Sequence, residues 1–345
     1  MDKKILAIAV ATAAVASPAL ALDVYDNNGS TFSVGGHVSV NINGSDDSDL
    51  GVGTNAPRVN FNFTQDLGNG YTADAKGEWG LDFLDGGDNS FTTRLGYIGL
   101  TNDAMGRVVV GTQWSPYYDV AGVTDKPIAY ATDFLYTHHG DAGTGRADKM
   151  VSYRKGFDLG GSDLALGLAW QGATTGTTIT GAVDYDDRFQ LTLAYNISAF
   201  MIGYALSTGD VDKQDGMSNA LSAKYGTYGD GLYAAAVYTL NDKVYGGRSN
   251  GAGVKGDLYD ESTAFEVILA YEFGNDWNLI WNYESLTEDG GLEREAYNET
   301  AIQLEYFVTP QFATYGGYQV DLRDEDKAEI DNTNDKYVIG MRYYL

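Results

Sequence analysis

The sequence contains no cysteine, only five prolines and only three histidines. The absence of cysteine excludes a disulfide framework, a thiol nucleophile and a cysteine-based metal site. Past residue 21 there is also no apolar run that approaches the ~20 residues of a membrane-spanning helix. The fold must therefore be held together by something other than disulfides or a bundle of membrane helices.

Basic residues are scarce as well. The chain has 22 Lys and Arg against 48 Asp and Glu, which gives a formal net charge of −26 at pH 7. Such a surface repels phosphate groups, so nucleic acid and anionic lipid headgroups are excluded as direct partners. Disorder is excluded too, because an aromatic content of 13% is too high for a chain that never packs.

The first 21 residues do not belong to the fold. Lys3 and Lys4 form a positive segment, residues 5–15 are almost wholly apolar, and residues 19–21 (Ala-Leu-Ala) form a cleavage pattern. The apolar stretch is too short to cross a bilayer as a helix. We expect a signal peptide that is cut after Ala21, followed by a single domain at residues 22–345.

The dominant pattern in that domain is an alternation of apolar and polar residues, which places each set on one face of a β-strand. Residues 177–185 are assigned to a loop, although they could instead extend a hairpin. Sixteen alternating segments occur, and their lengths suit the ~10-residue tilted strands of a membrane barrel. They are residues 32–42, 57–66, 71–82, 91–101, 106–114, 146–156, 162–172, 188–196, 199–208, 218–227, 231–240, 262–273, 277–287, 298–308, 311–321 and 336–345.

The connections between these segments alternate between short and long. One set is tight and rich in Gly, Asn and Asp, as in residues 66–70 and 274–276, and the other is long and acidic, as in residues 45–56, 210–217 and 323–335. This sorting predicts an all-β, antiparallel transmembrane β-barrel with short turns at one rim. Because an unpaired N–H or C=O in lipid costs several kcal/mol, the strands must close into a ring. A ring this wide cannot fill its lumen with side chains, so the lumen holds water.

The longest segment without a strand pattern is residues 115–145. Residues 111–120 (Gly-Thr-Gln-Trp-Ser-Pro-Tyr-Tyr-Asp-Val), at its start, strongly resemble the constriction loop of the general trimeric porins of Gram-negative outer membranes. Residues 93–100, 24–29 and 339–345 resemble the same family, and the resemblance covers the whole of residues 22–345. It implies sixteen strands, a homotrimer, and a third loop that folds inward and faces a basic wall.

The resemblance also indicates which basic residues form that wall. By the matching motifs they are Arg58, Arg94 and Arg146, with His37 where the family usually has lysine. The alternation gives a separate test, because all four lie opposite the apolar positions of their strands and are therefore predicted to point into the lumen. The alternative is that they are ordinary solvated charges. The apolar positions concerned are Val38 and Val40, Val59 and Phe61, Leu95 and Tyr97, and Val151 and Tyr153.

The acidic side of the predicted constriction is less complete. Asp125 matches the family's acidic position in a Thr-Asp motif. The family's second acidic segment, Pro-Glu-Phe-Gly-Gly, is replaced here by residues 126–130, which read Lys-Pro-Ile-Ala-Tyr. Asp133 is the candidate substitute, and Lys126 weakens the acidic side.

The resemblance implies a water-filled channel through which small hydrophilic solutes and ions diffuse passively, with no cofactor. The acidic loops should concentrate cations at the mouth, so we expect a cation preference that the arginines temper. The loop carboxylates can bind Ca²⁺ or Mg²⁺ weakly and bridge to lipopolysaccharide phosphates, although simple solvation is the alternative. The end strand is expected to be read by the barrel-insertion machinery, with Leu345 in place of the family's usual terminal phenylalanine.

Two other functions would require different residues. A substrate-selective porin for oligosaccharides would need a path of stacking aromatic residues, and Trp114, Tyr117, Tyr118 and Tyr130 are the candidates. An enzyme is not expected, because no histidine has a convincing Ser or Asp partner in the sequence. The G-x-S-x-G match at residues 247–251 lies in a polar loop and lacks the strand-turn-helix context of a nucleophile.

His138 and His139 are adjacent within the predicted constriction loop. Two neighbouring histidines could bind a transition metal, but adjacent side chains diverge on most backbones. Packing within the loop or exposure to solvent is therefore favoured over a metal site.

Overall fold

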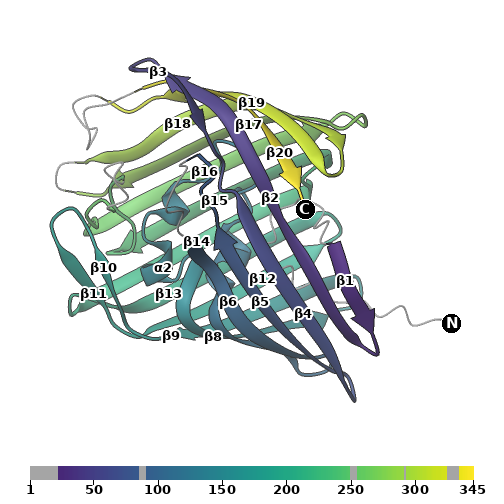
Figure 1. The fold of residues 1–345 in the computed structure, drawn as a ribbon. Helices are drawn as coiled ribbons and strands as arrows, with labels where there is room; N and C mark the ends of the chain where they lie inside the picture. The colour runs from purple at the N-terminus through teal and green to yellow at the C-terminus, as the bar shows by residue number, and fades with distance from the viewer. Residues whose placement is uncertain (1–21, 85–90, 249–254, 291–292, 325–333) are drawn as a thin grey trace.

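The computed structural model describes residues 22–84, 91–248, 255–290, 293–324 and 334–345, and it shows one closed β-barrel (Figure 1). Sixteen strands follow one another around the ring, each antiparallel to its neighbours, and the pairing of β2 with β20 closes it. The barrel strands are β2 (Ser30–Ser45), β4 (Arg58–Gly68), β5 (Tyr71–Gly80), β6 (Thr92–Asn102), β7 (Gly106–Trp114), β8 (Arg146–Asp158), β9 (Ser162–Gln171), β12 (Arg188–Ile197), β13 (Phe200–Val211), β14 (Gln214–Thr227), β15 (Asp230–Asp242), β16 (Glu261–Glu272), β17 (Trp277–Glu288), β18 (Glu295–Thr309), β19 (Phe312–Asp321) and β20 (Lys336–Tyr344).

Seven shorter elements accompany the barrel within the described residues. They are β1 (Leu22–Asn27), β3 (Ser48–Gly53), α1 (Pro116–Ala121), η1 (Phe134–Tyr136), α2 (His139–Ala142), β10 (Thr174–Thr177) and β11 (Ala182–Tyr185). Each of the sixteen predicted segments overlaps one barrel strand, so the predicted fold class is confirmed. The predicted signal peptide, residues 1–21, lies outside the described residues.

Three connections differ from their prediction as loops, and one of them, residues 45–56, contains β3, which pairs with β2. Residues 177–185 form part of a hairpin, as the alternative prediction had it. Strand β10 pairs with β11, from Thr174 opposite Tyr185 to Thr177 opposite Ala182. The predicted long loop at residues 210–217 is wrong, because β13 and β14 continue through it to a two-residue turn at Asp212 and Lys213. Both turn residues have a positive φ, 49° and 64°, which matches the twist of a tight hairpin. A run of acidic residues is therefore not enough to identify a loop.

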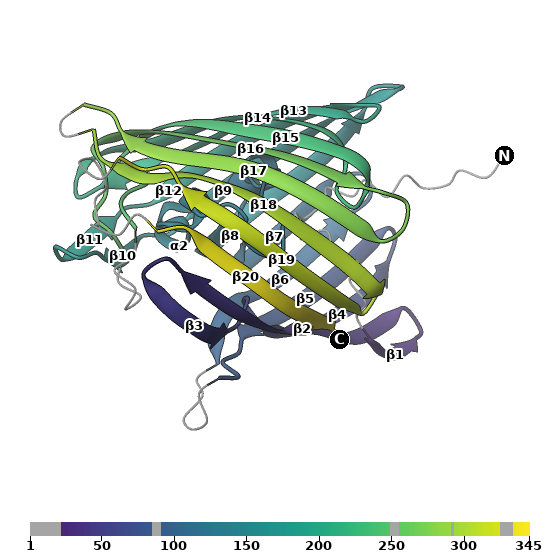
Figure 2. The ribbon, with the colours of Figure 1, turned by 90° about the horizontal axis from the view of Figure 1, so that it is seen from above.

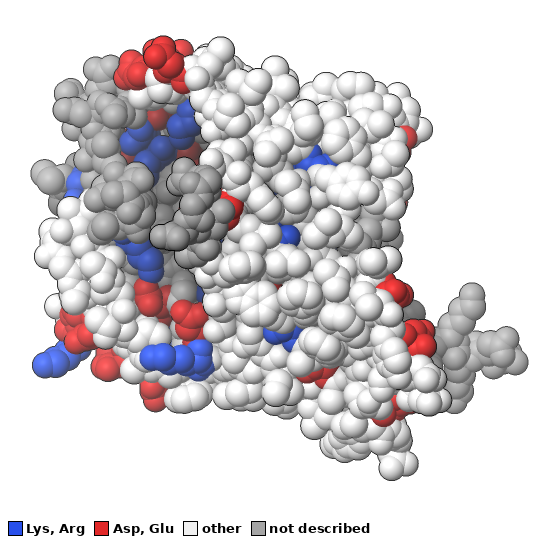
Figure 3. All heavy atoms as spheres, in the orientation of Figure 1, with Lys and Arg blue, Asp and Glu red and all other residues white. Residues whose placement is uncertain are grey.

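The barrel wall presents apolar side chains outward and polar side chains inward. Ile98, Ile202 and Ile339 are 68%, 65% and 74% exposed on the outer face. The visible outer wall is largely uncharged, and acidic and basic atoms gather mainly toward its two ends (Figure 3). Among the described residues, no helix is long and apolar enough to cross a membrane.

The two ends of the barrel differ in their connections. The described part of the N-terminus and the C-terminus lie at one end, whereas the hairpin of β10 and β11 and strand β3 lie at the other (Figures 1 and 2). We call residues 115–145, the third long connection, L3. It carries α1, η1 and α2, and its buried Tyr117, Phe134 and Leu135 pack with Tyr245 and Tyr259 in the largest apolar cluster of the interior. The interior core is thus built by L3 and not by the wall alone.

Candidate functional site

L3 enters the barrel through the short helix α1, whose first residues are ones that favour a helix N-terminus. The hydroxyl of Ser115 caps α1 by accepting the N–H of Tyr118 at 3.1 Å, and Pro116 occupies the first helical position. Gly122 ends the helix, and its N–H donates to the carbonyl of Tyr118. This cap directs the chain inward immediately after β7.

Glutamates on the inner wall hold the next part of L3. The Thr124 hydroxyl donates to Glu266 of β16 at 2.6 Å, and the backbone N–H groups of Ile128 and Asp133 donate to Glu305 and Glu284 at 2.7 and 2.9 Å. Hydrogen bonds to a carboxylate are stronger than neutral ones. The acidic strands β16 to β18 therefore fix L3 against one side of the lumen.

Tyr130 is a strained point in L3 that the wall also holds. Its φ of 39° is left-handed, which is costly for an aromatic residue. The side-chain amides of Asn282 and Gln303 both donate to the Tyr130 carbonyl, at 2.9 and 3.1 Å. Two donors from adjacent strands thus stabilise a conformation that the residue would not adopt alone.

Arg154 of β8 anchors the first turn of L3 from the opposite side. It is 3% exposed, and its guanidinium donates to Asp119 at 2.6 Å and to the Trp114 carbonyl at 2.7 Å. Burial raises the pKa of Asp119, and the neighbouring Arg154 opposes that rise. The ion pair therefore joins the helix α1 to the wall in a region with little water.

Replacing Arg154 by methionine is expected to destabilise the folded barrel by about 3 kcal/mol, because Asp119 is left as an uncompensated buried charge. Current through single channels should also become noisier as α1 loosens. The unfolding midpoint in urea and the open-channel noise measure both effects. The double variant Arg154→Met with Asp119→Asn should recover part of the stability. Arg107→Met is the matched control, since Arg107 is the register partner of Arg154 but pairs with Asp74 of β5 and not with a residue of L3. Both variants leave a largely buried aspartate unpaired, so the noise separates them, and an equal rise in open-channel noise in the two would contradict this role.

Two of the predicted basic residues meet at a glutamate that the sequence interpretation missed. Glu78 of β5 lies 2.9 Å from Arg94 and 3.8 Å from Arg58, and Lys76 lies 3.7 Å from the same carboxylate. Both arginine side chains are largely buried, at 16% and 13% exposure. The cluster carries three positive charges and one negative charge, so Glu78 reduces the positive charge of this wall without cancelling it.

The parity argument is wrong for Arg94. Leu95 pairs with Glu78 across β5 and β6, shares its inward face and is 2% exposed, whereas the argument required Leu95 to point outward. The register shifts between Glu78 and Trp79, so Arg94 is the extra residue of a β-bulge. The bulge turns the Arg94 side chain to the lumen side despite its position in the alternation.

Arg146 and His37 lie at other points of the wall. The Arg146 guanidinium lies 5.8 Å from the centre of the Trp114 ring. His37 is 6% exposed, its Nε2 lies 3.4 Å from the Asn55 carbonyl, and its ring contacts Tyr344 edge-on. The charge of this wall is therefore carried by arginines, and the imidazole of His37 is buried beside them.

The two predicted acidic residues of L3 have different surroundings. Asp125 accepts hydrogen bonds from the hydroxyls of both Tyr118 and Tyr136. Burial, together with the Asp125 charge, raises the pKa of both phenols well above the ordinary tyrosine value. Asp133 is exposed and lies beside Glu284 and Glu299 of the wall. The two acids are therefore not interchangeable.

The four aromatic residues suggested as a stacking path do not line the lumen together. Tyr117 and Tyr118 are 0% and 1% exposed, because α1 turns them against the wall and into the interior of L3. Trp114 and Tyr130 remain partly exposed. The Trp114 ring stacks on Tyr118 at 4.2 Å and meets Tyr136, which the sequence interpretation missed, at 6.5 Å. The predicted path of four aromatic rings is therefore wrong, because Tyr117 and Tyr118 are core residues.

The adjacent histidines take part in loop packing. His138 is 1% exposed, and its ring nitrogens contact the Tyr185 hydroxyl and the Gly256 carbonyl. Burial lowers the pKa of His138 to about 3, so it is neutral. The possible metal cluster found among the described residues contains neither histidine. Ser249 and Asn250 of the G-x-S-x-G match lie outside the described residues.

Comparison with known proteins decides the family. A family model described as "Gram-negative porin" matches residues 7–345. The chain belongs to the Gram-negative porin family. Porin-like protein L of Photobacterium profundum is 26% identical over 373 aligned residues, and outer membrane protein U of Vibrio parahaemolyticus is 24% identical; each alignment covers 99% of both proteins. This porin is therefore an outer-membrane protein of a Gram-negative bacterium, from a family of channels and not of enzymes.

Solved porins share the fold over nearly the whole chain. A Salmonella typhi OmpF complex with daunomycin has a TM-score of 0.79 at 19% identity and covers 94% of this chain and 100% of the other. An anion-selective porin from Comamonas acidovorans has a TM-score of 0.71 at 17% identity, with 92% and 100% coverage. Because an anion-selective protein has this fold, the fold alone does not set charge preference, and the lumen residues must be considered.

The lumen charges of this porin are divided between two sides. Arginines and Lys76 gather on the strands β4 to β8, whereas the glutamates that hold L3 belong to β16, β17 and β18. Sequence reasoning missed these glutamates, although the alternation had placed them on the polar faces of their strands. The missing information was which polar faces lie opposite each other across the barrel. The acidic residues concerned are Glu266, Glu284, Glu299 and Glu305.

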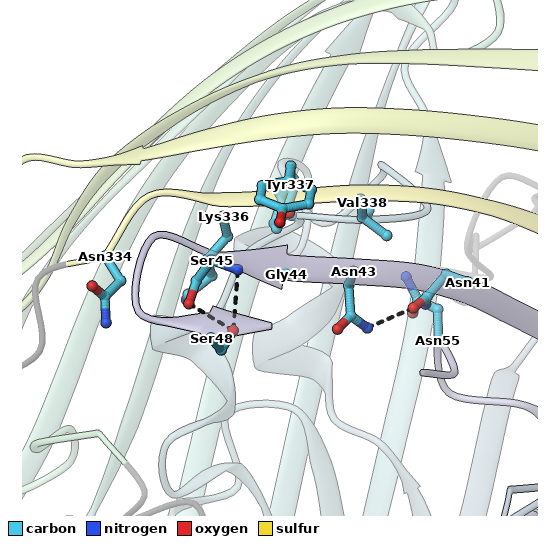
Figure 4. A pocket seen from close by; sticks show the side chains of 12 residues that line it. Asn41, Asn43, Gly44, Ser45, Ser48, Asn55, Asn334, Lys336, Tyr337 and Val338 are labelled. Atoms are coloured by element: carbon cyan, nitrogen blue, oxygen red, sulfur yellow. Dashed lines mark hydrogen bonds between the residues drawn. The ribbon is translucent and has the colours of Figure 1, made fainter. Parts of the chain in front are cut away.

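A pocket of about 470 Å³ lies between β2, β20 and the tip of L3. Asn41, Asn43 and Asn55 contribute amides, and Ser45 and Ser48 contribute hydroxyls that hydrogen-bond to each other (Figure 4). Lys336 is the charged residue among its lining. A second cavity of about 510 Å³ includes Arg94 and Asp82. Both cavities are lined in part by polar and charged side chains, which suits water and hydrophilic solutes.

Proposed function

We propose that this porin forms a water-filled channel for the passive, size-limited diffusion of small hydrophilic solutes and ions, with a preference for cations. The single observation that carries the channel is the inward-folded L3, held on both sides of a polar lumen by Arg154 and by the glutamates Glu284 and Glu305. The loop narrows the barrel at a fixed position. No binding energy is needed, so a solute that fits passes down its gradient.

The charges on the two sides of the passage orient the solute that moves between them. A solute moves between Arg58, Arg94 and Arg146 on the wall and Asp125 and Asp133 on L3, where opposite charges align its dipole. The net charge of −26 raises the cation concentration at the mouth, and Glu78 weakens the arginine side. These two effects support cation preference.

The same proposal covers the partners of the channel. A homotrimer in the outer membrane is supported by the similarity to porins such as OmpF. The acidic outer loops bind Ca²⁺ or Mg²⁺ weakly and bridge to lipopolysaccharide phosphates. The end strand, with Tyr343 third from the end and Leu345 last, is the signal for the barrel-insertion machinery.

Reconstitution in a planar bilayer tests the proposal. We expect conductance that closes in three equal steps and a cation-selective reversal potential across a KCl gradient. A Cl⁻-selective potential would overturn the ion preference alone. Correctly folded protein that gives no conductance would overturn the channel itself.

A substrate-selective channel for oligosaccharides is the second candidate. The pocket lined by Asn41, Asn43 and Asn55 favours it, because amides and hydroxyls bind sugars, whereas the burial of Tyr117 and Tyr118 opposes it. Glucose oligomers added to the bilayer chamber distinguish the two functions. Saturable block of the ion current at millimolar sugar supports a selective channel, and an unchanged current supports the general one.

A further inference from the structure

A group of three carboxylates joins L3 to the barrel wall. One carboxylate oxygen from each of Asp133, Glu284 and Glu299 lies within 4.8 Å of the other two. Asp133 belongs to L3, whereas Glu284 and Glu299 face each other across β17 and β18 as register partners. Three like charges this close repel one another unless something positive lies among them.

The hydrogen bonds of these carboxylates leave two oxygens free inside the protein. Glu284 and Glu299 are both 1% exposed. Oε2 of Glu284 accepts the Asp133 N–H, and Oε1 of Glu299 accepts a guanidinium N–H of Arg248 at 2.7 Å. Oε1 of Glu284 and Oε2 of Glu299 accept no hydrogen bond within the described part of the chain. Buried oxygens without a donor are costly, and a bound ligand would satisfy them.

The local charge balance indicates the kind of ligand. Arg248 neutralises one of the three carboxylates and is itself fixed at 4.4 Å over the Tyr297 ring. Two negative charges remain when all three carboxyl groups are ionised. Lys336 and Asp125 also face Asp133, and Glu266 faces Glu284, so the wider surroundings do not remove this surplus. A divalent cation supplies the missing charge.

We propose that Asp133, Glu284 and Glu299 bind one divalent cation, Ca²⁺, which bridges L3 to the wall. Ca²⁺ binds carboxylate oxygens at about 2.3–2.6 Å in irregular geometry, so oxygens up to 4.8 Å apart can share it. Mg²⁺ demands a tighter octahedron. The exposure of Asp133 gives the ion a route from the water-filled lumen, and water completes its coordination.

Calorimetric titration of Ca²⁺ into purified, chelator-treated protein in detergent tests the site. The wild-type chain should show one saturable site per chain, and Glu284→Gln should weaken it at least tenfold. Asp186→Asn, which removes one exposed carboxylate from an outer loop, is the matched control and should keep the site. Diffraction data from crystals grown with Ca²⁺ should show an anomalous peak between the three carboxylates.

Asp133→Asn keeps the test valid if Glu284→Gln fails to fold, because Asp133 lies on the loop and not on a barrel strand. Equal, non-saturating binding by the wild type and both variants would overturn the proposal. It would mean that protons and not a metal neutralise the cluster. Planar-bilayer conductance of the same samples separates this failure from a failure of the channel function, since an open channel does not require the cation.

Discussion

Replacing Arg94 by glutamate is expected to raise the permeability ratio of K⁺ to Cl⁻ about fivefold. The substitution changes the lumen charge by two units, and one charge at ~10 Å in water contributes about 0.4 kcal/mol to the energy of a passing ion. The effect has opposite signs for the two ions, and ~0.1 M salt screens part of it. Glu78, which Arg94 contacts at 2.9 Å, also loses one of its three cationic partners. The reversal potential across a KCl gradient measures the change.

Lys213→Glu is the control for this prediction. Lys213 lies in the exposed turn between β13 and β14, so the same change in charge occurs outside the passage. Its effect on the permeability ratio should be less than about twofold, because salt screens charges beyond about 10 Å. If both variants shift the reversal potential equally, selectivity arises from the overall charge and not from the wall at Arg94.

Replacing Gly36 by alanine is expected to prevent the barrel from closing normally, at a cost of about 3 kcal/mol or more. Gly36 has a φ of 127°, a conformation that L-residues rarely adopt, and an added Cβ would lie 2.1 Å from the backbone oxygen of Arg58. Its own carbonyl accepts the N–H of Leu345, so it lies at the seam where the last strand meets the first. The fraction of folded, heat-modifiable protein on gels and the urea midpoint measure the loss.

Gly96→Ala separates this local clash from a general cost of removing glycine. Gly96 also lies on a barrel strand, but an added Cβ would meet no atom within 4 Å. Its folded fraction should match that of the wild type. Wild-type stability in the Gly36 variant would show that β2 can shift away from β4, and the argument from the close contact would fail.

The strands and their inward faces could be predicted from the sequence because alternation is a local property. In residues 262–273, for example, Glu266 falls on the polar face without any knowledge of neighbours, and the structure places it inside. The turn at Asp212 and Lys213 escaped prediction, since acidic composition resembles that of a loop. The inward orientation of Arg94 was predicted for the wrong reason, because a β-bulge interrupts the alternation on which the prediction relied.

Much of the candidate site could not be predicted in this way. Glu78 lies beside Arg94 only because β5 and β6 pair in one register, and Asp133 meets Glu284 and Glu299 only because L3 folds back across the lumen. The first contact joins residues 16 apart on consecutive strands and depends on their register, whereas Asp133 and Glu284 are 151 residues apart. The burial of Tyr117 likewise follows from the side of α1 that faces the wall, which neither composition nor spacing reveals.

The sequence by itself determined that the chain forms a closed barrel of sixteen strands, because a period-two pattern in lipid leaves backbone groups no other partners. It also determined where L3 begins, through Ser115, Pro116 and the residues around them. Only the tertiary structure decided which charges meet. Closing the ring brings the arginines of β4 to β8 to one side of L3 and the glutamates of β16 to β18 to the other. Electrostatic interaction depends on distance in space, and the ring sets that distance independently of separation along the chain.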